Sequence, residues 1–175
     1  MIMSSRQRRR AVRTTPPATA DRPPEHDLGV LLTLALEAFK ERLHAHLARA
    51  GYDDLGPSFG FVFRSLADRP LSLVELAARL QISSQGALKI VTEMEGRGYV
   101  ERQDDATDRR VRRLALTNRG RSALREARRF HAAVERELTD GVGAEGVASA
   151  RTALETLAGE AVRDPTSWAK AARPF

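Results

Sequence analysis

The sequence of 175 residues contains no cysteine. It therefore cannot form a disulfide bond, a thiolate metal site or a cysteine redox switch. No apolar run approaches the roughly eighteen residues that a membrane-spanning helix needs, and the first residues lead into arginines without a hydrophobic signal segment. We therefore expect a cytoplasmic protein that has no contact with a membrane and senses any signal without thiol chemistry.

The motifs of common enzymes are also missing. The sequence has no Gly-x-Ser-x-Gly elbow, no His-Glu-x-x-His pair and no paired catalytic carboxylates. Residues 141–146 have the glycine spacing of a dinucleotide site, but such a site needs a preceding strand, and here a helical pattern precedes it. His44 and His46 are two residues apart on a predicted helix and point to different faces. We expect no catalytic residue, no metal and no cofactor.

The net charge of +6 is unevenly distributed. Arginine and lysine outnumber the acidic residues by six to two in residues 1–26 and by nine to four in residues 97–125. The remaining residues are mildly acidic, with seven basic against nine acidic residues in 27–96 and seven against eight in 126–175. A basic patch on a nearly neutral body is typical of a protein that binds nucleic-acid phosphates.

The N-terminal part divides into an arm and a helix. Residues 1–26 combine arginines with prolines and have little apolar surface to bury, so we predict a disordered basic arm. Asp27 is a predicted N-cap, and apolar residues then recur with helical spacing up to Gly51. The apolar face is wider than one packing partner needs, which predicts that this helix also touches a second subunit. The residues that widen it are Leu31, Leu34, Leu36 and Leu47.

Three short helices are expected next. Pro57 occupies a first-turn position and opens a helix of about ten residues that ends near Leu66. Ser72 and Glu75 form a capping box that opens a helix through Leu80. Ser83 caps the third helix of this group, which ends at one of two glycines, residues 96 or 98.

The last two of these helices predict a helix-turn-helix whose second helix enters the major groove of DNA. That groove, about 12 Å wide, accepts small or hydrogen-bonding side chains. Ser72 and Ser83 stand at helix N-termini, where we expect them to hold phosphates through backbone amides and hydroxyls. The alternative is that the outer face of the second helix is an ordinary solvated surface. If this helix does enter the groove, its candidate DNA contacts are Ser84, Gln85, Gly86, Leu88, Lys89 and Thr92.

Residues 100–120 predict a β-hairpin of the kind called a wing. In its second strand Leu114 and Leu116 should face inward while Arg113 and Ala115 face the other way. We expect three arginines of this hairpin to meet the DNA, some in the minor groove and one at the DNA backbone. Arg110, with Arg109 as the alternate, would enter the minor groove, Arg112 would contact the backbone, and Asp108 would aim the guanidinium groups. The alternative for Asp108 is an ordinary surface salt bridge.

The C-terminal part is predicted to be helical. Thr117 caps a long helix that Gly141 and Gly143 break, and a last helix follows until Asp164-Pro165 stops it. Residues 164–175 then form a short tail.

These segments resemble the MarR family of regulators. The resemblance rests on Asp108-Arg109-Arg110 followed by Leu116-Thr117-Asn118-Arg119-Gly120, and on residues 73–80 and 94–102. Ala106 stands where the family often has proline. The resemblance implies a mostly α fold with a small β-wing: a winged helix-turn-helix domain over residues 56–116, and a helical dimerisation region over residues 27–55 and 117–163. In that region the first and the last two helices of two subunits would interlock.

The resemblance further implies a homodimer and a small aromatic or lipophilic ligand bound between these two parts. Four phenylalanines near Gly60 are the candidate lining, although packed core is the alternative for them: Phe39, Phe59, Phe61 and Phe63. The sequence thus predicts a regulator, expected to be a ligand-responsive repressor, that binds a pseudo-palindromic double-stranded DNA operator. The rival is a sequence-neutral architectural DNA-binding protein, which the basic arm would suit. A small-molecule enzyme is a third class, and no motif favours it.

Overall fold

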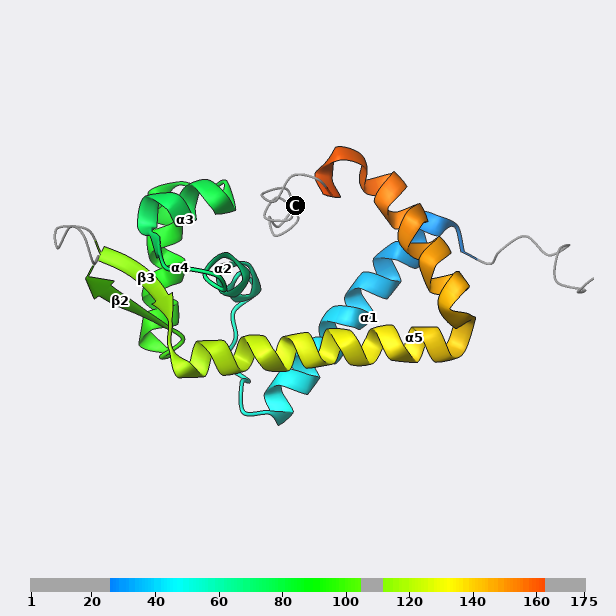
Figure 1. Ribbon diagram of the computed structural model, residues 1–175, viewed down its shortest axis with the longest axis horizontal. Coiled ribbons are helices and arrows are strands. Elements are labelled where there is room, and N and C mark those ends of the chain that lie inside the picture. Colours follow the sequence, from blue (N-terminus) through cyan, green and yellow to red (C-terminus); the bar gives the residue numbers. More distant parts are fainter. Residues whose placement is uncertain (1–25, 105–111, 163–175) are drawn as a thin grey trace, which may run out of the picture. The chain divides into compact units, whose positions relative to one another are not determined.

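The computed structural model of the chain describes residues 26–104 and 112–162 (Figure 1). The chain divides into two compact units, and the boundary lies between Ala38 and Phe39, inside the first helix. A mostly helical chain with one small antiparallel sheet confirms the predicted fold class. The helices are α1 (Leu28–Arg49), α2 (Phe59–Ser65), α3 (Leu73–Leu80), α4 (Ser84–Gly96), α5 (Asn118–Ala158) and the 3-10 helix Gly159–Val162, and the strands are β1 (Leu71–Ser72), β2 (Val100–Asp104) and β3 (Arg112–Leu116).

The first unit contains the start of α1. The Oδ1 atom of Asp27 accepts a hydrogen bond of 2.9 Å from the backbone amide of Val30, which confirms Asp27 as the N-cap. The leucines at positions 28, 31, 34 and 36 are between 46% and 67% exposed in the single chain. Apolar side chains at this exposure leave the start of α1 with uncovered hydrophobic surface.

The second unit packs α2, α3, α4 and the sheet around the N-terminal end of α5 (Figure 1). Tyr99 and Phe59 are among its largest fully buried side chains, together with Leu71, Leu76 and Met94. Burying one large apolar side chain contributes about 1.5 to 3 kcal/mol, so this cluster holds the short helices that could not persist alone.

The sheet has the order β1-β3-β2, with both pairs antiparallel. In the hairpin, Val100 lies opposite Leu116, and β1 adds Leu71 opposite Leu114 on the other edge of β3. Both leucines of β3 are buried, as the alternation predicts. Ala115, expected on the opposite face from these leucines, is also buried at 7% exposed, and it lines the same hollow as residues 66–70.

The start of α5 is fixed against the end of α4. Thr117 caps α5 as predicted: its Oγ1 accepts from the Gly120 amide at 3.1 Å and donates to the carbonyl of Gly98 at 2.6 Å. The Thr117 amide donates to the Tyr99 carbonyl at 3.1 Å. A Cβ atom on Gly120 would lie 2.2 Å from that same oxygen, so only glycine allows this approach.

The start of α2 and the end of α4 are more exactly placed in the structure than in the sequence prediction. Helix α2 begins at Phe59 and not at Pro57, because the Phe59 amide closes a tight turn on the Gly56 carbonyl at 3.1 Å before the helix can start. Of the two glycines expected to end α4, Gly96 is its last residue and Gly98 adopts the left-handed conformation that follows, at φ +73°.

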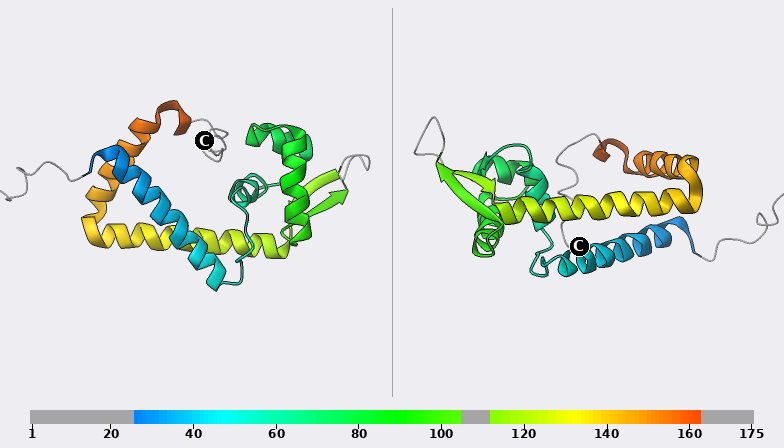
Figure 2. Two further views of the ribbon diagram at one scale, coloured as in Figure 1. Left: turned by 180° about the vertical axis from the view of Figure 1, so that it is seen from behind. Right: turned by 60° about the horizontal axis from the view of Figure 1, so that its bottom comes forward.

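The predicted division of the C-terminal region into two helices is confirmed, with the break at Gly143 (φ 76°, ψ 164°) and not at Gly141, which lies within the first helical limb. The two limbs, which together carry the label α5, correspond to the predicted long helix and last helix (Figure 2). The second limb ends at Ala158, where Gly159 has φ +58°, which is earlier than the expected stop. Pro165 lies outside the described residues, and the glycine-rich run occupies a bent helix with no strand before it.

Substituting Gly120 by alanine should lower the free energy of unfolding by about 3 kcal/mol, because the new methyl group collides with the Tyr99 carbonyl. The control is Gly141→Ala, where no atom lies within 4 Å and alanine favours the helix by about 0.5 to 1 kcal/mol. Urea unfolding followed by circular dichroism measures both values. Equal stability of Gly120→Ala and the wild type would disprove the tight contact.

Candidate nucleic-acid interface

Helix α4 has one buried face and one exposed face. Ala87, Val91 and Met94 are completely buried against the core. The Ser83 Oγ accepts from the Gly86 amide at 3.1 Å, which confirms the predicted cap, and Gly86 itself is half-buried beside it. The other predicted contact residues all lie on the exposed face: Ser84, Gln85, Leu88, Lys89 and Thr92. The structure thus presents these five side chains to solvent on one side of a rigid helix.

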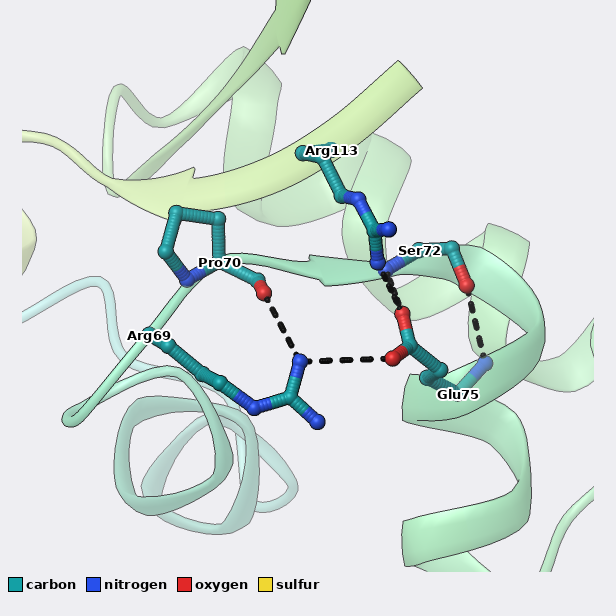
Figure 3. Close-up of polar contacts among 5 residues, drawn as sticks. All are labelled: Arg69, Pro70, Ser72, Glu75 and Arg113. Carbon is teal, nitrogen blue, oxygen red and sulfur yellow. Dashed lines mark hydrogen bonds and ion pairs between the residues drawn. The ribbon is translucent and has the colours of Figure 1, made fainter. Parts of the chain in front are cut away.

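Helix α3 is anchored by Glu75, whose carboxylate is the centre of a polar cluster (Figure 3). The predicted capping box is present, with Glu75 Oε2 accepting from the Ser72 amide at 2.7 Å and Ser72 Oγ accepting from the Glu75 amide at 3.2 Å. Arg69 donates to Oε1 at 3.3 Å and to the carbonyl of Pro70 at 3.4 Å, and Arg113 of β3 pairs with Oε2. One carboxylate therefore joins the start of α3 to β3 and to the segment before β1.

This cluster determines the protonation of Glu75 and the role of Ser72. The hydrogen bonds from the Ser72 backbone and side chain, together with Arg69 and Arg113, lower the pKa of the Glu75 carboxyl to about 2. The Ser72 amide, which we expected to face a phosphate, donates to this carboxylate. Sequence reasoning recognised the capping box but not its arginines, since Arg113 is 38 residues away and no local pattern connects it to Glu75.

The hairpin is tied to α4 by charged pairs at its base. The guanidinium of Arg102 in β2 binds both carboxylate oxygens of Glu95 in α4, at 2.9 and 3.1 Å. Such two-pronged contacts fix the direction of both side chains. Arg112 of β3 is exposed and forms an ion pair of 2.6 Å with Asp104 across the hairpin. The predicted tip residues Asp108, Arg109 and Arg110 lie outside the described residues.

A cavity of about 580 Å³ lies between the second half of α1, the segment 55–57, α2 and α5. Of the four phenylalanines proposed to line it, Phe59 and Phe63 do so, although both also belong to the buried core. Phe61 packs against the core and Phe39 stacks on Phe130 with ring centres 5.3 Å apart, and neither lines the cavity.

Arg64 and His131 are polar residues that line this cavity. Arg64 Nη2 and His131 Nε2 are 3.5 Å apart. Burial, followed by the charge of Arg64, lowers the pKa of His131, so the imidazole is neutral near pH 7. Part of the lining is apolar: Leu43, Leu47, Leu55, Phe59, Phe63, Ala123 and Leu124. In addition to Arg64 and His131, the polar residues His44, Arg128 and Glu135 line the cavity. A concave site with apolar walls and a few polar groups is typical of small-molecule sites.

Among residues 26–104 and 112–162, no three histidine or carboxylate side chains gather into a group able to hold a metal ion. None of the helices in these ranges combines the length and the apolar character that a membrane crossing requires.

Comparison with known proteins adds family information. Residues 61–111 match the model of the MarR family. The chain is similar to the exopolysaccharide II synthesis transcriptional activator ExpG of Rhizobium meliloti, with 26% identity over 115 residues, 66% of this chain and 59% of ExpG. It is also similar to the transcriptional repressor MprA of Escherichia coli, with 42% identity over 52 residues, 30% of each chain. The chain thus spans less than two thirds of the length of these curated relatives.

Solved structures match a larger part of the chain. The transcriptional repressor CouR, solved bound to a 23-mer DNA duplex, is 28% identical with a TM-score of 0.58. This match covers 76% of the present chain and 93% of CouR. The similarity extends beyond the short helices and the hairpin, and it supports a regulator fold over most of the described residues.

Replacing Glu75 by glutamine should destabilise the protein in a pH-dependent way. Because the folded-state pKa is depressed to about 2 from an ordinary 4.5, the charged form stabilises the fold above about pH 5, and this contribution disappears as the pH falls toward 2. Allowing for solvent screening, Glu75→Gln should lose about 1 to 2 kcal/mol at pH 7.

Urea unfolding at several pH values between 2 and 7 measures this difference. The exposed Glu145 offers a matched control, because Glu145→Gln should change stability by no more than about 0.5 kcal/mol. A gap between wild type and Glu75→Gln that stays constant from pH 7 to pH 2 would contradict the assigned role of the carboxylate.

Proposed function

We propose that this chain, whose residues 61–111 match the model of the MarR family, is a winged-helix transcriptional regulator of that family that acts as a cytoplasmic, homodimeric repressor of a pseudo-palindromic operator. The observation that carries the proposal is the exposed face of α4. Its side chains reach solvent while the opposite face is completely buried, so the helix can enter a groove without unfolding its own core.

The chemistry of this face suits base reading in the major groove. Gln85 has the amide that pairs with adenine, and Lys89 can donate to guanine or to a phosphate. Leu88, which is 40% exposed, can contact a thymine methyl group. We assign sequence discrimination to these three residues, with Ser84 and Thr92 as hydrogen-bonding neighbours.

The hairpin supplies the backbone contacts in this proposal. Arg112 can exchange its exposed ion pair with Asp104 for a phosphate, since both side chains are about 60% exposed. Arg110 or Arg109, aimed by Asp108, would enter the minor groove. Ser83 is our candidate phosphate anchor at the start of α4, whereas we assign Ser72 to holding α3, because its amide is already bonded to Glu75.

Uncovered apolar surface supports the homodimer. Besides the leucines at the start of α1, helix α5 exposes large apolar side chains in and after its first limb. Soluble monomers rarely leave so many large apolar side chains exposed. A second copy of the same chain is the partner that the family implies. The residues on α5 are Leu138, Val142, Leu154 and Leu157.

We further propose that the cavity between α1, α2 and α5 binds an aromatic or lipophilic acid that regulates DNA binding. Its volume of about 580 Å³ falls within the range of roughly 300 to 1,000 Å³ typical of small-molecule sites. The apolar walls suit a ring or a chain, and Arg64 beside the neutral His131 suits a carboxylate. A thermal-shift screen of aromatic acids tests this, because selective binding raises the melting temperature.

A sequence-neutral architectural protein is the second candidate, favoured by the basic residues of 1–26 and 97–125. The two functions differ in specificity. A duplex selected by the wild-type protein from a random pool should compete at least about a thousandfold better than bulk genomic DNA if the protein is a regulator. A ratio near one would establish the architectural function.

Alanine at Gln85 should relax discrimination at one base pair of the selected duplex and cost about 1 to 3 kcal/mol of binding free energy. Alanine at Lys89 should weaken binding, and if Lys89 meets a phosphate it should also reduce the salt dependence by about one counterion. Fluorescence anisotropy across a salt series measures both effects. Arg136→Ala, at an exposed position in α5, is the charge-matched control for Lys89 and should bind normally. Wild-type affinity in both variants would disprove the α4 assignment.

A further inference from the structure

The loop between α1 and α2 is attached to the DNA-reading part of the chain through Asp54. The Asp54 carboxylate accepts a hydrogen bond from the Tyr99 hydroxyl and another, of 3.1 Å, from Arg119 Nη2. Arg119 also donates to the Tyr99 hydroxyl at 3.1 Å, so the three side chains form a closed triangle. We call this group the Asp54 latch. Its members come from the α1–α2 loop, the junction of α4 with β2, and the first turn of α5.

Tyr99 is the rigid member of the latch. Its residue is completely buried, and its ring lies 5.9 Å from the ring of Phe59 and 5.6 Å from that of Phe63. Its carbonyl receives the Thr117 amide and touches Gly120. The hydroxyl of Tyr99 is therefore held in place by the core, and Asp54 is the part that a movement of the loop would displace.

A second connection runs from the same loop to the end of α4. Arg97, the residue that follows α4, donates to the backbone carbonyl of Asp54 and pairs with Glu93 of α4 at 2.6 Å. Its guanidinium lies 5.4 Å from the centre of the Phe59 ring. Asp54 is thus bound through its side chain to Tyr99 and through its backbone carbonyl to Arg97, and these two partners flank Gly98 in the sequence.

The next three residues of the loop, 55–57, form a wall of the cavity, and Phe59 lines it as well. A molecule that fills the cavity contacts this wall and the Phe59 ring. Both are in direct contact with the latch, so one short segment borders the cavity on one side and the recognition helix on the other.

We infer that Asp54 is a positioning residue that couples the cavity wall at residues 55–57 to the orientation of α4, so that displacement of this wall lowers affinity for DNA. The inference rests on the proposed function, since it names the route by which the proposed cavity ligand would regulate the proposed DNA contact. The cavity ligand is the aromatic or lipophilic acid proposed above. It displaces the wall through its shape and not through its acidity.

The charges of the latch are suited to a mechanical role. Partial burial would raise the pKa of Asp54, but the hydrogen bonds from Tyr99 and Arg119 and the charge of Arg119 hold it below its usual value. Burial and the bond to Asp54 raise the pKa of Tyr99 to about 12. Near pH 7 the carboxylate is therefore charged and the phenol protonated, and the facing cations are Arg97 and Arg119. Only a shift of position breaks the contact under these conditions.

A double-mutant cycle tests the coupling without a ligand. The probe is Gly56→Ala, because a Cβ there would lie 2.9 Å from the Phe59 ring and must displace the loop or the ring. Affinity for the duplex selected by the wild type is measured by anisotropy. We expect Gly56→Ala to reduce it at least about fivefold in the wild type, but less than twofold in Asp54→Ala, which removes the acceptor oxygen and opens the latch. Asp53→Ala, at the exposed neighbouring aspartate, is the matched control background and should behave like the wild type.

Three outcomes of this cycle decide the inference. An equal effect of Gly56→Ala in all backgrounds would show that Asp54 does not carry the coupling, and no effect in the wild type would show that the wall is not coupled to DNA binding. Either result overturns the inference. The expected pattern supports the inference if it is reproduced when Tyr99→Phe, which removes only one hydroxyl, replaces Asp54→Ala.

Hydrogen exchange gives a reading that does not depend on DNA. The Gly98 and Tyr99 amides, which donate to the carbonyls of Glu95 and Met94, should exchange at least about fivefold faster in Asp54→Ala than in Asp53→Ala, while the Leu80 amide stays unchanged. Unchanged exchange at Gly98 and Tyr99 would overturn the latch even if the protein binds its operator. If the wild type shows no preference among duplexes, the proposed function fails and this arm still tests the latch.

Discussion

The close contact between the start of α5 and the carbonyl of Tyr99 is the constraint on which the rest of the second unit depends. Gly120 allows the contact, and Thr117 fixes it with hydrogen bonds to Gly98 and Tyr99. Since Tyr99 directly follows the turn after α4, this one approach sets where α4 ends and where the hairpin and the long helix begin. The proposed function, in which one part reads DNA and another binds a ligand, needs such a junction to be stiff.

Carboxylates then set the directions of the elements around this junction. Glu75 holds α3 against β3, Glu95 holds the end of α4 against β2, and Asp54 holds the α1–α2 loop against both Tyr99 and Arg119. Individually these partly exposed pairs stabilise the fold only modestly. Their contribution is geometric, because each one joins elements that the apolar core alone would leave free to slide.

Much of this arrangement could be predicted from local sequence signals. Helix caps need only a residue and the three that follow it, so Asp27, Ser72, Ser83 and Thr117 were all recognisable, and so were the exposed positions of α4. Longer-range features were not. Ala115 is buried, Gly143 and not Gly141 bends α5, and the partners of Asp54 are 45 and 65 residues away. No periodicity or spacing encodes contacts of this kind.

The central claim is that two copies of α4 read two half-sites of one operator. Hydroxyl-radical footprinting of the duplex selected by the wild-type protein tests it most directly. We expect two tracts of protected sugar-phosphate backbone whose centres lie about 10 to 10.5 base pairs apart, or a multiple of that spacing, as two α4 helices in successive major grooves require. Uniform protection along the duplex, or a single protected tract at saturating protein, would contradict it.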